Sequence, residues 1–97
     1  MMLKTIDYKV PDGKMLKIKL DIEGESIKSI IILGDFFLHP ESTIEQIEAN
    51  LVGCKIDMET ITARIQEVLD NSNSTLLGAK ADDIAKAIDK AFLEYND

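Results

Sequence analysis

The sequence predicts an α+β domain: a three-stranded antiparallel sheet followed by about three helices that pack on one of its faces. Apolar residues recur with a period of two up to residue 37 and with a period of about 3.6 after residue 39. The strands come first and the helices later, with no β-α-β alternation, which favours an antiparallel sheet. We expect one domain over residues 1–97, with the sheet within residues 3–37 and helices at about 42–52, 58–69 and 81–95.

Three strands are predicted before residue 37. Residues 3–10 and 14–23 alternate between apolar and polar side chains, and the second of these runs has the more regular pattern. The residues at 11–13 and 24–26 are of the kinds that form tight turns, so hairpins are expected there. One face of the sheet should therefore be exposed to water at the second strand.

The third predicted strand, at about residues 27–35, is apolar on both faces. Ile30 and Ile32 alternate with Ile31 and Leu33, so periodicity does not decide which pair faces the helices. In a simple meander this strand lies at an edge of the sheet, where an exposed apolar strand promotes aggregation. We therefore expect a helix or another protein to cover it.

Helix boundaries are marked by residues with capping preferences. Ser42 and Glu45 have the spacing of a capping box, and Gly53 stands where the first helix should end. Asp57 is predicted to cap the second helix. Residues 70–74 prefer turns, and the segment through Gly78 is predicted to form a loop before the third helix.

Charge is distributed unevenly along the chain. The 18 acidic residues outnumber the 11 basic ones, which gives a net charge of −7, and the whole surplus lies after His39. Nucleic acid is not an expected partner, because binding to a phosphate backbone needs a clustered basic face. No apolar run of about 18 residues and no leader-like segment is present, so we expect no membrane contact and a cytoplasmic location.

No set of catalytic residues stands out in the sequence. Asp35 follows a glycine at the end of a strand, but it has no histidine or second carboxylate at a telling spacing, and we favour a structural role at the turn. His39 has no further His or Cys at metal-ligand spacing and is interpreted as a surface residue. Cys54, the single cysteine, follows the end of a predicted helix, where the helix dipole opposes a thiolate. We interpret it as a small hydrophobic residue.

Two segments resemble a known family. They read Ile27-x-x-Ile30-Ile31-Ile32-x-Gly34-Asp35-Phe36-Phe37 and Ile44-x-x-Ile47-Glu48-x-x-Leu51-x-Gly53. Together with the order of strands and helices, they are similar to the accessory domain of lipoate–protein ligases. In that family the domain is either the C-terminal part of one chain or a separate small subunit, and a free-standing chain that begins at Met1 resembles the second case.

The resemblance implies a subunit that is not itself the catalyst. Lipoate, ATP and Mg would bind to a large catalytic subunit, with which this chain would form a heterodimer, and no cofactor would bind here. The pair would form lipoyl-adenylate and then modify a lipoyl carrier domain. The residues at the end of the third strand are the candidates for the partner interface: Gly34, Asp35, Phe36, Phe37, Ile30 and Ile32.

Two alternatives remain open from the sequence. The accessory domain is similar in fold to sulfur-acceptor proteins and iron–sulfur scaffolds, so Cys54 could act as a single-cysteine sulfur acceptor. A plain protein-interaction module with no link to lipoate is the other alternative.

Phe36 and Phe37 are predicted to point to opposite sides of the strand, one into the core and the other toward a partner or a turn.

Overall fold

The computed structural model describes residues 4–11 and 13–95. Leu3, where the first strand was expected to begin, and Asp12, in its predicted turn, lie outside the described residues. The elements follow the order β1 (Lys4–Lys9), β2 (Met15–Glu23), β3 (Ser26–Gly34), β4 (Phe37–His39), α1 (Thr43–Leu51), α2 (Met58–Asn71), β5 (Thr75–Leu77) and α3 (Ala81–Tyr95). The predicted α+β class is confirmed, whereas β4 and β5 were not predicted.

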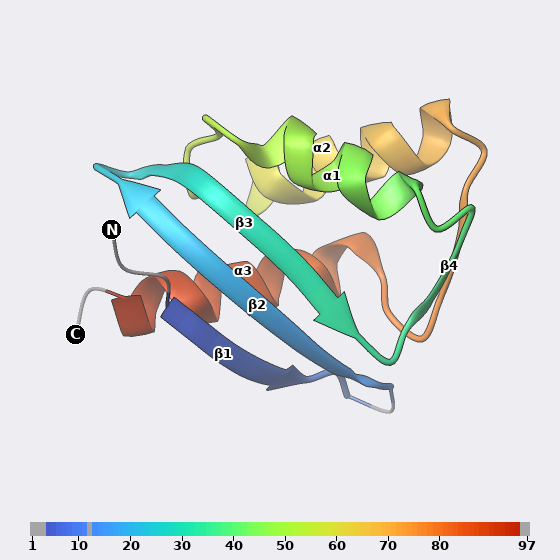
Figure 1. Cartoon of the computed structure of the whole chain (residues 1–97), viewed down its shortest axis with the longest axis horizontal. Coiled ribbons are helices and arrows are strands. Elements are labelled where there is room, and N and C mark those ends of the chain that lie inside the picture. Colours follow the sequence, from blue (N-terminus) through green and yellow to red (C-terminus); the bar gives the residue numbers. More distant parts are fainter. Residues whose placement is uncertain (1–3, 12, 96–97) are drawn as a thin grey trace.

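The main sheet has the strand order β1-β2-β3, and both pairings are antiparallel. Its central row joins Ile6, Ile18 and Ile32, which are opposite one another across the three strands. Helix α3 packs against β1 and β2 on one face of the sheet, while α1 packs beside β3 and α2 packs on α1 and α3 (Figure 1). The opposite face of the sheet carries no other described element.

One hydrophobic core lies between the sheet and the helices. Alternation along β2 places Leu16, Ile18 and Leu20 on the helix-facing side, and all three are fully buried. The helices contribute apolar residues at the spacing of one helical face, namely Ile47, Leu51, Ile61, Ile65, Ile84 and Ile88. Every element except β5 therefore supplies at least one fully or nearly fully buried side chain to this core.

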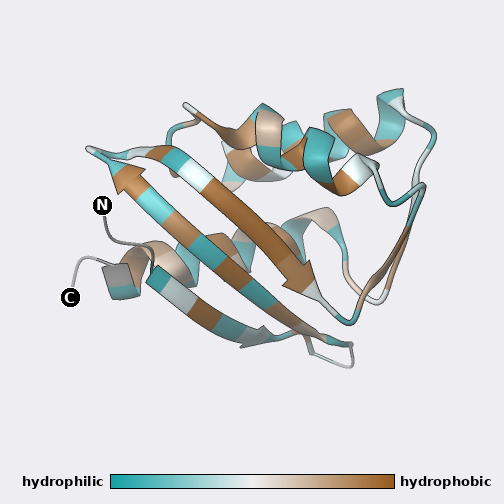
Figure 2. Cartoon of the chain, viewed as in Figure 1, coloured by the Kyte–Doolittle hydropathy of each residue, from teal (hydrophilic) through white to brown (hydrophobic). Residues whose placement is uncertain are grey.

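A bulge decides which side of β3 faces the helices. The register between β2 and β3 shifts between Asp21 and Ile22, whose partners are Ser29 and Ile27. Lys28 is the extra residue, so Ile27 and Ile30 lie on the same face although their sequence parity differs. Figure 2 shows the uninterrupted hydrophobic stretch along β3 beside the alternating pattern of β2.

The outer edge of β3 is partly covered, as expected for an apolar edge strand. The Glu48 carboxylate of α1 accepts a hydrogen bond of 2.7 Å from the backbone N–H of Ile32. Nearer the start of β3, the backbone N–H of Ile27 donates to the carbonyl oxygen of Cys54 (2.9 Å). The backbone N–H of Gly53 donates to the carbonyl oxygen of Ile27 (2.7 Å). These bonds occupy backbone groups that would otherwise offer a template for pairing with another chain.

The ranges predicted for the helices agree with the structure within two residues, but one predicted cap is wrong. Asp57 caps α2, because its carboxylate accepts bonds from the backbone N–H (3.0 Å) and hydroxyl (2.8 Å) of Thr60. The capping box predicted from Ser42 does not form, since the Ser42 side chain makes no capping hydrogen bond. A tight turn precedes the helix instead: the backbone N–H of Thr43 donates to the carbonyl oxygen of Pro40 (3.0 Å), and that of Ile44 donates to the carbonyl oxygen of Glu41 (3.1 Å).

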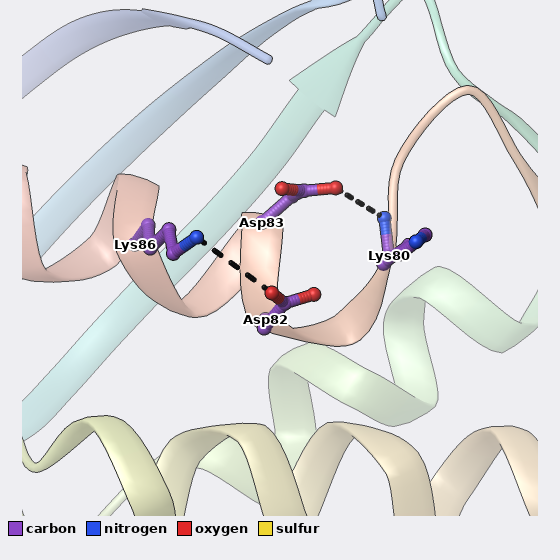
Figure 3. A network of polar contacts seen from close by, with 4 residues as sticks. All are labelled: Lys80, Asp82, Asp83 and Lys86. Atoms are coloured by element: carbon purple, nitrogen blue, oxygen red, sulfur yellow. Dashed lines mark hydrogen bonds and ion pairs between the residues drawn. The ribbon is translucent and has the colours of Figure 1, made fainter. Parts of the chain in front are cut away.

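Helix α3 begins with two aspartates that suit the positive end of the helix dipole. The Asp83 carboxylate accepts a hydrogen bond of 2.9 Å from the backbone N–H of Lys80, and Asp82 lies 3.7 Å from the ammonium of Lys86 (Figure 3). The backbone hydrogen bond and the ion pair are both exposed to solvent, so they mark the start of the helix more than they add to stability.

Strands β4 and β5 form a second, two-stranded sheet. Phe37 lies opposite Leu77, and His39 lies opposite Thr75. The segment before β5 is attached to α1 and α2 by hydroxyl groups: Thr43 and Ser74 are 2.7 Å apart, and Ser74 and Ser72 are 2.6 Å apart. The region predicted as a loop at residues 70–78 therefore contains a short strand, β5. Its central residue, Leu76, pairs with Leu38 of β4, which is 38 residues earlier in the sequence.

Candidate docking site

The junction between β3 and β4 is shaped by close backbone contacts. A Cβ atom at Gly34 would lie 2.6 Å from the carbonyl oxygen of Met15, so only glycine fits there without a shift of the backbone. The backbone N–H of Asp35 then donates to the same carbonyl, at 3.1 Å, and continues the pairing with β2. Gly78 has a φ of +94° and faces Phe36 from the other side.

The two phenylalanines after this junction point in different directions, as predicted from strand alternation. Phe36 is half-buried and packs against the core. Phe37 is 58% exposed and stacks on the His39 ring, with ring centroids 6.4 Å apart and an interplanar angle of 7°. Leu38, between the two outward-facing rings, is buried. Phe37 is therefore the residue of this pair that is available to another molecule.

A groove of about 290 Å³ lies between the end of β3, β4 and the start of α1. Four of the predicted interface residues line it, Ile32, Gly34, Phe36 and Phe37, together with Leu33 and Ile44. Glu41 supplies the one ionisable group of its lining. We call this hollow the β3–β4 groove. Its shallow apolar walls suit a protruding apolar side chain of another protein better than an enclosed small molecule.

The structure corrects the assignment of the isoleucines of β3. Ile30 and Ile32 are buried in the core, so the surface side of this strand belongs to Ile31 and Leu33 instead. Ile32 reaches the floor of the β3–β4 groove, whereas Ile30 does not line it. The sequence contained no signal for this choice, because both parities of the strand are apolar and the bulge at Lys28 reverses the inference from Ile27.

Asp35 and His39 do not form a reactive pair with neighbouring groups. Asp35 is exposed, and within the described residues its carboxylate makes no hydrogen bond, so the predicted capping role at the turn is not seen. His39 is exposed beside Phe37, in agreement with the surface role inferred for it. Within residues 4–11 and 13–95, no group of three His, Cys, Asp or Glu side chains could hold a metal ion.

Cys54 lies in an environment that suits a thiol rather than a nucleophile. It is 1% exposed, and its Sγ donates to the carbonyl oxygen of Lys55 at 3.3 Å. Burial raises the pKa of the Cys54 thiol; the Arg64 guanidinium lowers this pKa in part, and the Asp57 carboxylate raises it further. A buried neutral thiol neither attacks an electrophile nor accepts sulfur readily.

A larger hollow, of about 480 Å³, lies between α2 and the start of α3. Two of its carboxylates already have partners: Gln66 donates to Asp70 at 2.9 Å, and Asp82 pairs with Lys86 outside the hollow. These groups form no nucleophile-and-base pair.

Among the described helices, none has both the length and the apolar character needed to cross a membrane.

Fold and site together define a small α+β domain that carries a shallow, mostly apolar groove and no catalytic set among its described residues. Residues 6–88 match the family described as the bacterial lipoate protein ligase C-terminus. The chain belongs to this family.

Two relatives come from Thermoplasma acidophilum. The chain is 38% identical over 56 residues to lipoate-protein ligase A subunit 2, and this match spans 58% of either protein. It is also similar to a chain in the solved structure of an archaeal lipoylation system, a bi-partite lipoate protein ligase and its E2 lipoyl domain. That likeness has a TM-score of 0.74 at 31% identity and covers 89% of this chain and 93% of the other.

Proposed function

We propose that this chain is a non-catalytic accessory subunit of a lipoate–protein ligase and works as a heterodimer with a large catalytic subunit. The observation that carries this proposal is the family match over residues 6–88, joined by the likeness to a chain of a bi-partite ligase system. Lipoate, ATP and Mg²⁺ bind to the large subunit in this proposal. The pair activates lipoate to lipoyl-adenylate and transfers the lipoyl group to a carrier domain in the cytoplasm.

An accessory subunit without catalytic groups has a physical task in such a reaction. Lipoyl-adenylate is a mixed anhydride that water hydrolyses, so a subunit that helps to close the partner's site protects the intermediate. The same contact can order substrate loops of the catalytic subunit before the chemical step. Neither task requires a nucleophile or a base in the accessory chain.

The β3–β4 groove is the proposed contact with the catalytic subunit. Gly34 and Phe36 shape the groove, and Phe37 projects from its wall, exposed on the far side from the core. Asp35 adds an exposed carboxylate beside them. A large aromatic side chain that is exposed at the rim of an apolar hollow is the kind of residue that anchors protein interfaces.

The sulfur-acceptor alternative is disfavoured by the surroundings of Cys54. A sulfur acceptor needs an accessible thiolate, whereas Cys54 is buried with a raised pKa. The comparisons point to a ligase subunit instead, and no observation favours a second function.

Reconstitution tests the proposed function. The purified chain, a purified catalytic subunit that lacks an accessory domain, and their mixture are each supplied with lipoate, ATP and Mg²⁺, and pyrophosphate release is measured. We expect turnover only in the mixture. A catalytic subunit that forms lipoyl-adenylate equally fast without this chain would contradict the proposal, and so would turnover by this chain alone.

A further inference from the structure

The outer edge of β3 presents backbone groups as well as side chains. β3 is the last strand of the main sheet, so only one of its edges pairs with a strand, and α1 lies beside the other (Figure 1). Two parts of this outer edge are occupied, because the segment after α1 bonds to Ile27 and the Glu48 carboxylate bonds to the N–H of Ile32. Ile30, between them, is buried. The accessible part of the edge therefore lies beyond the N–H of Ile32.

The hydrogen bond to Glu48 shows which backbone groups point outward. In an antiparallel ladder, residues that bond to the neighbouring strand alternate with residues whose N–H and C=O point away from it. The N–H of Ile32 points away from β2, because it donates to Glu48. Asp35 points the other way, since its N–H donates to the carbonyl oxygen of Met15 on β2 at 3.1 Å. The C=O of Ile32 and the N–H of Gly34, two residues further along β3, therefore point to the outer edge.

This acceptor and this donor are unpaired within the described chain. No described group donates to the Ile32 carbonyl oxygen or accepts from the Gly34 N–H. Both residues line the β3–β4 groove, whose walls are mostly apolar. A molecule that fills the groove without bonding to these groups would cover them at a cost in free energy. The groove therefore favours an occupant that carries one N–H and one C=O at the spacing of a strand.

We propose that the β3–β4 groove binds an extended segment of the catalytic subunit, which adds to the outer edge of β3 as a short strand. A backbone N–H of the segment donates to the C=O of Ile32, and a backbone C=O of the segment accepts from the N–H of Gly34. Apolar side chains of the segment lie against the walls of the groove. This inference rests on the proposed function and specifies the mode of recognition, which is the addition of a strand to a sheet edge.

The two ends of the free edge limit this pairing to a few residues. In one direction, the Glu48 carboxylate already accepts from the N–H of Ile32, which a longer strand would need. In the other direction, β3 ends at Gly34, and Phe36 packs against the core. Glu48 thus stops the edge from acting as a template for long strands, which protects the free chain from aggregation. The segment pairs through two main-chain bonds and gains the rest of its affinity from apolar contacts.

A second copy of this chain fits the groove poorly. In a two-fold dimer the same patch of each copy meets its equivalent. Ile32 and Gly34 lie in a hollow between β4 and the start of α1, so each copy would bring a concave surface against a concave surface. A projecting segment reaches these groups, whereas the walls of a second groove keep its own edge away from them. A projecting segment of the catalytic subunit is therefore the occupant to which the proposal commits.

Hydrogen exchange tests the bond to Gly34 directly. Amide exchange of the isotopically labelled full chain is followed by NMR, alone and saturated with the purified catalytic subunit. We expect the Gly34 amide to exchange at least about ten-fold more slowly in the complex, because a hydrogen-bonded amide exchanges only when its bond opens. Gly24 provides the comparison. Its amide lies in the exposed turn between β2 and β3, has no partner among the described groups, and should exchange at the same rate in both samples.

A backbone ester provides an independent test. The chain is assembled from residues 1–53 and 54–97 by chemical ligation at Cys54, with glycolic acid in place of Gly34. This change removes the N–H and leaves every side chain in place. We expect the ester to weaken binding to the catalytic subunit about three- to ten-fold, as for the loss of one hydrogen bond. The matched control, with glycolic acid in place of Gly24, should bind within about two-fold of the unmodified chain. Melting curves ensure that only folded protein is compared.

The outcomes separate this inference from the proposed function. If the unmodified chain binds and activates the catalytic subunit but the Gly34 amide gains no protection, the inference is wrong while the proposed function stands. A folded Gly34 ester that binds as tightly as the unmodified chain would have the same meaning, and so would an equal loss in the Gly24 control. A chain that binds no catalytic subunit would overturn both. A Gly34 amide that is already protected in a dimer of the chain alone would assign the free edge to self-association and overturn the inference.

Discussion

Phe36 and Phe37 are adjacent in sequence, yet the structure gives them different surroundings. Phe36 lies between two glycines and packs against the core, whereas Phe37 reaches the surface and stacks on His39. One residue therefore contributes to stability and the other is free to contribute to association. This difference can be measured with two alanine substitutions.

We predict that Phe36→Ala lowers the free energy of unfolding by about 2 kcal/mol, less than the roughly 3–5 kcal/mol typical of a fully buried phenylalanine, because Phe36 is half-buried. Phe37→Ala should leave the melting temperature nearly unchanged and weaken association with the catalytic subunit by about 1–2 kcal/mol or more. Urea denaturation and binding measurements on both variants check these values. If both variants melt early and the folded fraction binds normally, the docking role of Phe37 is wrong.

Cys54 provides a second prediction at the scale of one residue. Its thiol is buried and its pKa is raised by burial, so we expect slow alkylation of the native protein and rapid alkylation in urea. Cys54→Ala should retain the activity of the reconstituted ligase within a few-fold. Mass spectrometry after a timed iodoacetamide reaction checks the first expectation. Complete loss of activity in a folded Cys54→Ala variant would restore the sulfur-acceptor hypothesis.

Among the elements, α2 depends on a cap whose charge can be removed by acid. The hydroxyl of Thr60 and then its backbone N–H hold the pKa of the Asp57 carboxyl below its ordinary value of 3.8. A carboxyl with a lower pKa in the folded state stabilises that state above the unfolded pKa, and this contribution is lost as the pH falls through the folded pKa. The wild type should therefore be more stable than Asp57→Asn at pH 7.

The difference between the wild type and Asp57→Asn should disappear at a pH well below 3.8, where both side chains are neutral. Thermal melts of the two proteins between pH 2.5 and 7 measure it, with the pH range chosen to bracket the ordinary pKa by about one to three units. Because Asp57 is exposed, added salt should reduce the difference at neutral pH. A difference that is independent of pH would mean that the carboxylate acts through its shape alone.

A second prediction at the scale of elements concerns the hydrogen-bonded hydroxyl groups that connect α1, α2 and the segment before β5. Thr43 is fully buried, and its hydroxyl is 2.7 Å from that of Ser74. We predict that Thr43→Val, which keeps the shape of the side chain, lowers stability by about 1–2 kcal/mol because a buried hydrogen bond is lost. A double-mutant cycle with Ser74→Ala measures the coupling, and Thr62→Val on α2 is the control. Additive effects would show that the two hydroxyls act independently.

At the scale of the whole molecule, the sequence predicted the main sheet and all three helices because their periodic patterns are long. It missed β4 and β5 because each strand has three residues, too few for a period to be visible, and because their pairing joins residues that are distant in sequence. The capping box is absent for a local reason: Ser42 has the right spacing to Glu45, but its backbone is already in the αR region (φ −60°, ψ −16°), whereas a capping residue is normally extended.

The residues predicted for the partner interface lie in different surroundings. Phe37 and Gly34 were named as candidates for the partner interface; both line the β3–β4 groove, and their contact with a partner stays a prediction. Ile30 and Ile32 were named as interface candidates although periodicity left the outward side of β3 undecided, and the structure places Ile31 and Leu33 on that side. Because apolar residues occupy both sides of β3, the sequence pattern does not show which side faces the core. The bulge at Lys28 changes which residues share a side with Ile27.

The packing of α3 against β1 and β2 has a consequence for the nascent chain. All three strands of the main sheet have been synthesised by residue 34, but the helix that covers β1 and β2 begins only at Ala81. A ribosome adds roughly 5–20 residues per second, so the apolar face of the sheet waits for seconds without its cover. A chain truncated after Lys80 should show no cooperative melt and should aggregate, which circular dichroism and light scattering can measure. A truncated chain that still melts cooperatively would show that the strands with α1 and α2 fold before the last helix leaves the ribosome.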